Sequence, residues 1–291
     1  MSTFTETTFT SSDGQLRLYA RDYAPHSGLA RLPVICIHGL TRNSADFEEL
    51  APWIASQGRR VLAVDVRGRG NSAYDQDPAN YRPMVYAQDI IKLAHDLGIA
   101  RAVFIGTSMG GLITMTLAFA RLGLIGAAVL NDVGPALSLR GLQRIAAYAG
   151  KDEVFGCWAD AANYTRAINQ VAFPDNTSED WDKWARRAFT ETGSGQLAMR
   201  YDPKIAVPIH AGKIKPSSFV ARMSFRRLAR KRPTLLIHGA LSDLIEKEQV
   251  ALMQAAAPML TCAEIPGVGH APMLTEPAAQ AALREFLGRV D

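Results

Sequence analysis

Cysteine and long apolar runs are both scarce in this chain, and each scarcity excludes a class of protein. The three cysteines, Cys36, Cys157 and Cys262, are odd in number and widely spaced, so we expect free thiols rather than a disulfide framework. They form no cluster with metal-ligand spacing, and we expect no metal ion. The sequence also has no internal repeat and no low-complexity tract.

The apolar stretches are too short for a membrane protein. The run at 32–37 is among the longest, whereas a membrane-spanning helix needs about 18 apolar residues. Residues 1–10 lack the apolar centre of a signal peptide. We therefore expect a soluble, cytoplasmic protein without a membrane partner.

Charge of one sign gathers at a single place only. The formal net charge is +4, and most basic residues stand singly among acids. The exception is the segment 222–232, which contains six basic residues: Arg222, Arg226, Arg227, Arg230, Lys231 and Arg232. A solvated helix face accounts for such a segment, and we expect no nucleic-acid partner.

The remaining composition is that of a globular protein with a large core. Of the 291 residues, 48% are hydrophobic and 21% are charged. Residues 4–10 and 15–23 alternate apolar and polar side chains around a Ser-Ser-Asp-Gly turn, which predicts an opening antiparallel hairpin. Six continuous apolar runs follow, most of them with a helical pattern after them, at 32–38, 60–66, 101–106, 125–132, 233–238 and 261–265.

Apolar runs without alternation are typical of strands that helices cover on both faces. We therefore predict an α/β fold with a doubly wound, mostly parallel, eight-stranded sheet. The strand pattern is interrupted between the fourth and fifth runs, so we predict a core domain of 1–135 and 232–291 and a helical cap inserted at 136–231. The oligomeric state is open at this stage.

The predicted cap contains three of the four tryptophans, Trp158, Trp181 and Trp184. Aromatic side chains in a cap can line a pocket for an apolar substrate. Packing between the cap helices would use the same residues, and both interpretations stand at this stage.

The residue with the clearest chemical role is Ser108, in the motif Gly-Thr-Ser-Met-Gly at 106–110. The motif lies between a predicted strand and a predicted helix. A serine on a sharp strand-to-helix turn has a strained backbone, and glycines on either side avoid collisions across the turn. Ser108 is therefore the candidate nucleophile.

A serine hydroxyl needs a base, and the base needs a carboxylate that orients it. His270 follows the last predicted strand in a loop of small residues and is the candidate base. Asp243, in the loop after the strand at 233–238, is the predicted acid, which gives the chain order Ser, Asp, His. Asp132, at the end of the strand at 125–132, is the alternative acid.

Acyl transfer also needs donors for the oxyanion, usually two backbone amides. We assign them to Met109, which follows the nucleophile, and to Leu40, in the turn after the strand at 32–37. His38 and Asp65 are interpreted as structural residues that hold their loops.

Together, His38-Gly39-Leu40, the Asp-Val-Arg-Gly-Arg-Gly segment at 65–70, the serine motif, Asp243 and Gly269-His270 resemble the α/β-hydrolase superfamily over nearly the whole chain outside the insertion. The resemblance implies a nucleophile, acid and base at Ser108, Asp243 and His270, and no metal or organic cofactor. It also argues against dehalogenation and epoxide opening, because relatives with those activities use an aspartate as nucleophile.

The resemblance implies a serine hydrolase that cleaves small-molecule esters or lactones of moderate apolarity, including aliphatic polyesters. One alternative is hydrolysis of a carbon–carbon bond in a ring-cleavage product. In that case a substrate carboxylate would need basic residues such as Lys213, Lys215, Arg222 or Arg226. Another alternative is a non-catalytic ligand-binding protein on the same fold.

Overall fold

The computed structural model describes residues 4–26, 31–212 and 215–290. Its main sheet has eight strands in the order β1-β2-β4-β3-β5-β6-β10-β11. The strands are β1 (Thr5–Thr10), β2 (Arg17–Tyr23), β3 (Val34–Ile37), β4 (Val61–Asp65), β5 (Ala102–Thr107), β6 (Ile125–Asn131), β10 (Thr234–Gly239) and β11 (Thr261–Ile265). β2 is antiparallel to both β1 and β4, and the other pairs are parallel. The predicted hairpin and the predicted sheet are confirmed.

Helices cover both faces of this sheet because alternate side chains of each buried strand point to opposite faces. In β3, Val34 and Cys36 pack with α1 (Leu50–Ser56) and α10 (Pro277–Gly288). Ile35 and Ile37 belong to the cluster on the other face. That face is covered by α2 (Pro83–Asp96), α3 (Met109–Arg121), α8 (Phe219–Ala229) and α9 (Lys247–Ala256).

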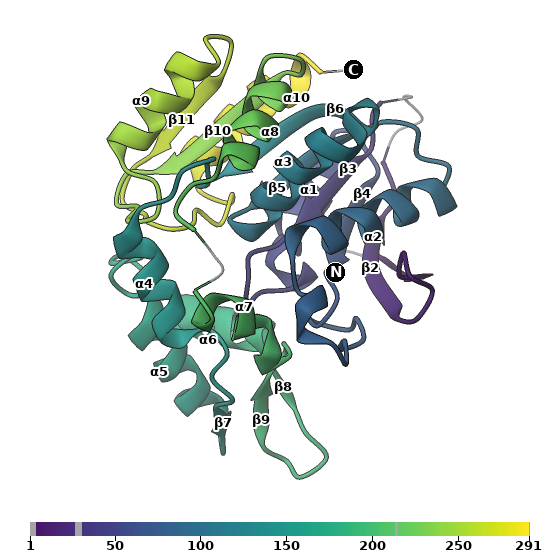
Figure 1. Cartoon of the computed structure of the whole chain (residues 1–291). Coiled ribbons are helices and arrows are strands. Elements are labelled where there is room, and N and C mark those ends of the chain that lie inside the picture. The colour runs from purple at the N-terminus through teal and green to yellow at the C-terminus, as the bar shows by residue number, and fades with distance from the viewer. Residues whose placement is uncertain (1–3, 27–30, 213–214, 291) are drawn as a thin grey trace.

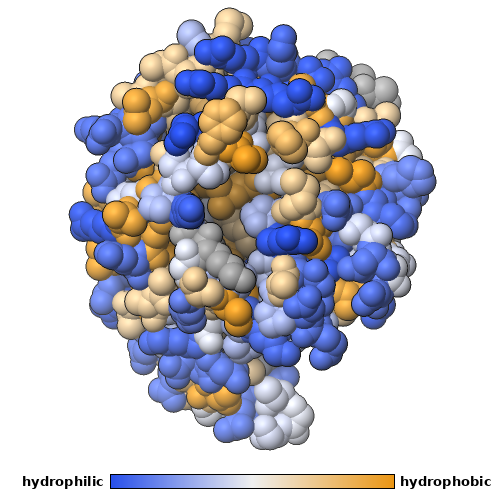
Figure 2. Space-filling model, in the orientation of Figure 1, coloured by the Kyte–Doolittle hydropathy of each residue, from blue (hydrophilic) through white to orange (hydrophobic). Residues whose placement is uncertain are grey.

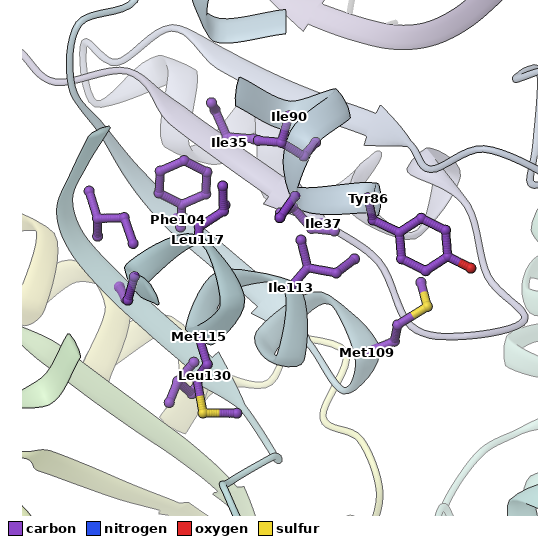
Figure 3. Close-up of a cluster of buried hydrophobic side chains, with 14 of the residues drawn as sticks. Ile35, Ile37, Tyr86, Ile90, Phe104, Met109, Ile113, Met115, Leu117 and Leu130 are labelled. Atoms are coloured by element: carbon purple, nitrogen blue, oxygen red, sulfur yellow. The ribbon is translucent and has the colours of Figure 1, made fainter. Parts of the chain in front are cut away.

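Figure 3 shows the second cluster, in which side chains of α2 and α3 lie against those of β3 and β5. Ile35, Ile113 and Leu117 are each fully buried there. Such complete burial stabilises the core by about 1.5–3 kcal/mol for each large aliphatic side chain. The same packing fixes the N-terminus of α3, where the serine motif lies.

The segment between β6 and β10 contains most of the smaller elements (Figure 1). Its helices are α4 (Leu139–Tyr148), α5 (Trp158–Asn169), α6 (Ser178–Ala188), α7 (Val207–His210) and α8, with a 3₁₀ turn at Pro203–Ala206. Three further 3₁₀ turns, at Ser44–Phe47, Pro78–Asn80 and Leu122–Leu124, lie before β6. A small antiparallel sheet, with strand order β7-β9-β8, joins Val154–Phe155, Leu197–Met199 and Phe189–Glu191. The sequence did not predict this sheet, because strands of two or three residues are too short for a hydrophobic pattern.

One helix of the insertion, α8, packs against the main sheet. Phe225 and Leu228 of α8 are buried in the same cluster as Ile113 of α3. α8 therefore covers the main sheet, and the division at 136–231 stays a prediction from sequence.

The insertion is tied to the core by polar contacts of the buried Arg187. Arg187 of α6 pairs with Glu48 and Glu49, and its carbonyl accepts a hydrogen bond of 2.7 Å from Asn43. Such contacts hold the insertion over the carboxyl edge of the sheet. Among the described residues, no helix is long and apolar enough to cross a membrane.

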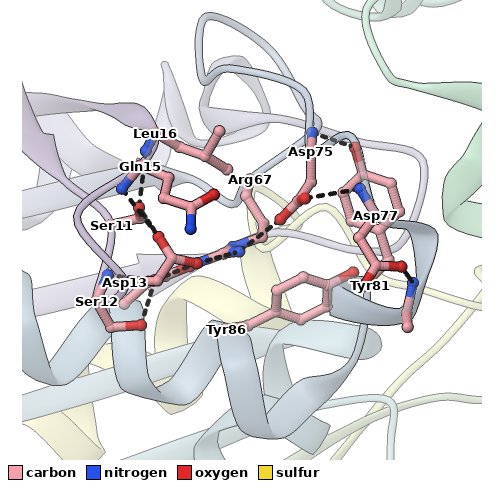
Figure 4. Close-up of polar contacts among 12 residues, drawn as sticks. Ser11, Ser12, Asp13, Gln15, Leu16, Arg67, Asp75, Asp77, Tyr81 and Tyr86 are labelled. Atoms are coloured by element: carbon pink, nitrogen blue, oxygen red, sulfur yellow. Dashed lines mark hydrogen bonds and ion pairs between the residues drawn. The ribbon is translucent and has the colours of Figure 1, made fainter.

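The loop after β4 is held by carboxylates. Asp65 accepts backbone hydrogen bonds from Ser44, at 2.6 Å, and from Asn71, at 2.8 Å, which confirms its structural role. Next to it, the fully buried Arg67 donates to Asp89 through two nitrogens, at 2.7 and 2.8 Å, and to Asp75 at 2.6 Å. Figure 4 shows Arg67 between Asp13 and Asp75.

Removing this guanidinium should be strongly destabilising, because it would leave buried carboxylates without a partner. We expect Arg67→Met to lower the free energy of unfolding by about 3–5 kcal/mol in urea titrations. The matched control is Arg60→Met, which removes the more exposed pair with Asp22 and should cost no more than about 1 kcal/mol. Equal losses in the two variants would contradict this account.

Candidate active site

Ser108 lies between β5 and α3 with an unusual backbone, at φ 53° and ψ −114°. A Cβ atom at Gly106 would collide with the backbone of Gly110, and one at Gly110 would collide with the carbonyl of Ile37. The two glycines therefore allow the sharp turn that projects the serine from the sheet edge. The Ser108 amide also donates to the Asn131 carbonyl at 3.0 Å, which fixes the turn to β6.

His270 lies between Ser108 and Asp132. Its Nε2 is 2.9 Å from Ser108 Oγ, and its Nδ1 is 2.8 Å from Asp132 Oδ2. With the Nδ1 proton donated to the carboxylate, the Nε2 lone pair faces the serine hydroxyl. This arrangement can remove the proton from Ser108.

The structure corrects the predicted acid. Asp243 is turned away toward α4, where Arg144 binds both of its oxygens at 2.6 and 2.7 Å. In the turn after β10, it is Ser242, the residue before Asp243, that faces Asp132. Its Oγ donates a hydrogen bond of 2.6 Å to Asp132 Oδ2. The carboxylate that receives His270 is therefore Asp132, the alternative acid of the sequence analysis.

Besides Ser242, sequence reasoning missed two further partners of this carboxylate. His238 Nδ1 and the Gly239 amide each lie 3.0 Å from Asp132 Oδ1. Both belong to the end of β10, next to β6 in the sheet. The signal available in the sequence was that Asp132 directly ends a buried strand, whereas Asp243 follows its strand by several residues.

Asp132 is fully buried, which would normally favour its neutral form. Burial disfavours the charged carboxylate, yet the hydrogen bonds from His238, His270 and Ser242 outweigh it, so the pKa of Asp132 lies below its ordinary value. The carboxylate is thus ionised at neutral pH and can stabilise a protonated His270.

The two predicted oxyanion donors lie beside the serine. Leu40 and Met109 line a pocket together with Ser108. Within the described part of the chain, neither backbone amide has an acceptor. The loop after β3, which contains Leu40, lies close to Ser108, since a Cβ atom at Gly39 would be 3.8 Å from Ser108 Cβ.

Two pockets meet at Ser108. The first, here called the His270 pocket, is lined by Ser108, His270, Arg42, Tyr148 and Trp184. The second, here called the apolar pocket, encloses about 240 Å³. Its lining includes Leu40, Met109, Leu112, Val133, Leu142 and Ile145.

The face drawn in Figure 2 is hollowed near its centre, and apolar side chains are visible inside the hollow. Of the three tryptophans predicted for the substrate pocket, only Trp184 lines a pocket that contains Ser108. Trp181 stacks on Trp184 at 5.6 Å between ring centroids, and Trp158 packs in the same aromatic cluster of the cap. Helix packing therefore accounts for Trp158 and Trp181.

A sequence profile of the alpha/beta hydrolase family matches residues 34–283. The chain belongs to this family. Of its relatives, the 3-hydroxybutyrate-oligomer hydrolase of Cupriavidus necator is 34% identical over 261 residues, which cover 87% of each chain. Esterase Rv0045c of Mycobacterium tuberculosis is 33% identical over 102 residues, which cover 35% of this chain and 33% of the esterase.

Among solved structures, an alpha/beta hydrolase from Novosphingobium aromaticivorans is 42% identical and superposes with a TM-score of 0.90, covering 100% of both chains. The crystal structure of E-2-(acetamidomethylene)succinate hydrolase is 22% identical, with a TM-score of 0.80 and 98% of each chain covered. At 22% identity, this second likeness shows a common fold and nothing further. The family assignment and the eight-stranded fold are thus confirmed for this alpha/beta hydrolase.

His38 supports the loop that carries Leu40. Its Nδ1 lies 2.7 Å from the Gly39 carbonyl, and its Nε2 accepts from the Val66 amide at 3.1 Å. Burial lowers the pKa of this histidine to about 4, so the ring is neutral at neutral pH. Its structural role is confirmed.

The neutral His38 predicts a pH-dependent stability. In the unfolded chain the pKa of His38 is near 6.5. Between pH 4 and pH 6.5 the unfolded chain therefore binds a proton at His38 that the folded chain does not bind. Its contribution is therefore complete above pH 6.5 and is lost as the pH falls toward 4.

As the pH falls from 6.5 to 4, we expect protonation of His38 in the unfolded chain to lower the free energy of unfolding by up to about 3 kcal/mol. The measurement is urea denaturation at several pH values. His38→Gln should lose this part of the pH dependence, because glutamine does not titrate there. An unchanged slope in that variant would contradict the assignment.

Proposed function

We propose that this alpha/beta hydrolase is a serine hydrolase of carboxylic esters, with Ser108 as nucleophile, His270 as general base and Asp132 as the orienting acid. The observation that carries the proposal is the continuous chain of hydrogen bonds from Ser108 Oγ through His270 to Asp132, at 2.9 and 2.8 Å. A pre-aligned nucleophile and base are what acyl transfer requires.

In the first half of the reaction, Ser108 Oγ attacks the ester carbonyl carbon while His270 Nε2 takes the hydroxyl proton. The tetrahedral intermediate then collapses, the carbon–oxygen bond to the alcohol breaks, and His270 returns the proton to the leaving oxygen. In the second half, His270 removes a proton from water, which attacks the acyl-enzyme. The free acid leaves and Ser108 regains its proton.

We assign stabilisation of the oxyanion to the backbone amides of Leu40 and Met109. Both residues lie beside Ser108, and Met109 begins α3, so its amide is at the positive end of the helix dipole. Donors without a competing acceptor are suited to this role because they need no rearrangement when the charge develops.

The two pockets would receive different parts of the ester. The leaving oxygen must meet His270 Nε2, so we assign the leaving alcohol to the His270 pocket, which that residue lines. The acyl group then extends into the apolar pocket beside Met109 and Leu40. Apart from Ser108 and Gln143, the lining of the apolar pocket is aliphatic or tyrosine, which favours an apolar acyl chain.

For the substrate class we propose small aliphatic esters, with linear oligomers of a hydroxyacid as the first to test. The supporting likeness is to the 3-hydroxybutyrate-oligomer hydrolase, which covers 87% of each chain. Lactones would form the same kind of acyl-enzyme and fall within the proposal.

Of the basic residues named for carbon–carbon bond hydrolysis, those that the structure describes do not line the pockets at Ser108, and Arg42, which lines the His270 pocket, is paired with Asp46. Lys215, Arg222 and Arg226 line neither pocket at Ser108, and Lys213 lies outside the described residues. The non-catalytic alternative would leave the aligned base without a function.

The first experiment is turnover of p-nitrophenyl esters of increasing acyl length and of 3-hydroxybutyrate oligomers by the wild type and by Ser108→Ala. We expect kcat to fall by roughly 10⁴-fold or more in the variant, with unchanged folding by circular dichroism. Ser56→Ala, a change at the end of α1, is the matched control and should retain full activity. Absence of Ser108-dependent turnover from every ester would reject the proposed function.

A second experiment separates the two aspartates. Asp132→Asn should lower kcat for a p-nitrophenyl ester by about 10⁴-fold, because the amide no longer favours the tautomer that His270 needs. Asp243→Asn should change kcat by less than about 10-fold, since that carboxylate pairs with Arg144. The reverse order of the two effects would return the acid to Asp243.

A further inference from the structure

A third pocket, lined by basic side chains, adjoins the His270 pocket. It lies where α4 and α5 meet the loop after β10, and Figure 1 shows α4 between α9 and α5. Arg140, Arg144 and Lys151 line it, together with Asp243. We call it the basic pocket.

The basic pocket and the His270 pocket share two lining residues, Tyr148 and Ile168. Tyr148 is the last residue of α4 and Ile168 lies near the end of α5. A ligand in the His270 pocket that passes between these two side chains would reach the three basic residues. The two pockets are therefore neighbours across Tyr148 and Ile168, on the side of the site to which we assign the leaving alcohol.

The charges of this pocket are not balanced within it. Asp243 is the one acidic residue of the lining, and it is paired with Arg144. Within the described part of the chain, neither Arg140 nor Lys151 has a carboxylate within 4.0 Å. The pocket therefore carries an excess of positive charge that an anion could neutralise.

Arg144 is held in a fixed orientation. Asp243 binds its Nε and Nη2 atoms, and only 25% of the arginine side chain is exposed. The pair with Asp243 does not use Nη1, and the Tyr148 hydroxyl also interacts with this guanidinium. A second carboxylate would bind at Nη1 beside Tyr148. An arginine oriented in this way loses less side-chain entropy on binding a ligand than a mobile one does.

We propose that the basic pocket binds a free carboxylate at the end of the substrate's leaving group. This inference rests on the proposed function, and it narrows the substrate to an ester whose alcohol part is itself a hydroxyacid. The acyl part would occupy the apolar pocket, and the chain would be cleaved at a fixed distance from its acidic end.

The test compares substrates that differ only in this carboxylate. Linear 3-hydroxybutyrate dimer, trimer and tetramer are supplied as free acids and as primary amides, and hydrolysis is followed by chromatography of the products. We expect the wild type to cleave the free acids with a kcat/KM about 10-fold or more above that of the amides, through a lower KM. The shortest oligomer that shows this preference reports the distance from Ser108 to the basic pocket.

The informative variant replaces Arg140 and Lys151 together by glutamine, because both side chains are exposed and Arg144 is needed by Asp243. We expect KM for the preferred free acid to rise about 10-fold, with kcat and the KM for the amide unchanged. Arg226→Gln, which also removes an exposed arginine, is the control and should alter neither KM. Added salt should raise KM for the free acid only.

Equal KM values for the acid and the amide of every oligomer in the wild type would overturn this inference. An equal rise of KM for the acid and for the amide in the double variant would also overturn it. Turnover of oligomers or p-nitrophenyl esters in those cases would leave the proposed function intact, whereas no turnover of any ester would reject the proposed function itself.

Discussion

The buried carboxylate of Asp132 is the constraint on which the arrangement of this site depends. A charge without solvent contact is costly unless donors surround it, and here the donors are His238, His270, the Gly239 amide and Ser242. They come from the end of β10, the loop that follows it and the loop after β11. The position of one carboxylate therefore determines how both loops approach Ser108.

The same principle explains why Asp243 has a different partner. The hydroxyl of Ser242 binds Asp132, and the next residue along the chain then faces α4, where Arg144 binds it. The loop after β10 thus satisfies two carboxylates on its two sides. One faces His270, and the other orients an arginine at the wall of the neighbouring pocket.

The insertion of this alpha/beta hydrolase lines both pockets at Ser108. Leu142 and Ile145 of α4 line the apolar pocket, and Tyr148 at the end of the same helix lines the His270 pocket. One helix therefore lines both pockets to which the proposal assigns the two parts of an ester. Its placement depends on contacts between the insertion and the core, such as those of Arg187 with Glu48 and Glu49.

The sequence by itself determined the strands of the main sheet, the turn at Ser108 and the loop with His270. Each of these depends on neighbours within about ten residues: alternation, continuous apolar runs or glycines around a strained serine. Tertiary structure decided the rest. Asp132 and Asp243 both follow strand ends, and the side chains that distinguish them, His238 and Arg144, lie 106 and 99 residues away from them. The roles of Trp181 and Trp184, the packing of α8 and the basic pocket likewise depend on distant segments, because packing between elements leaves no local pattern in the sequence.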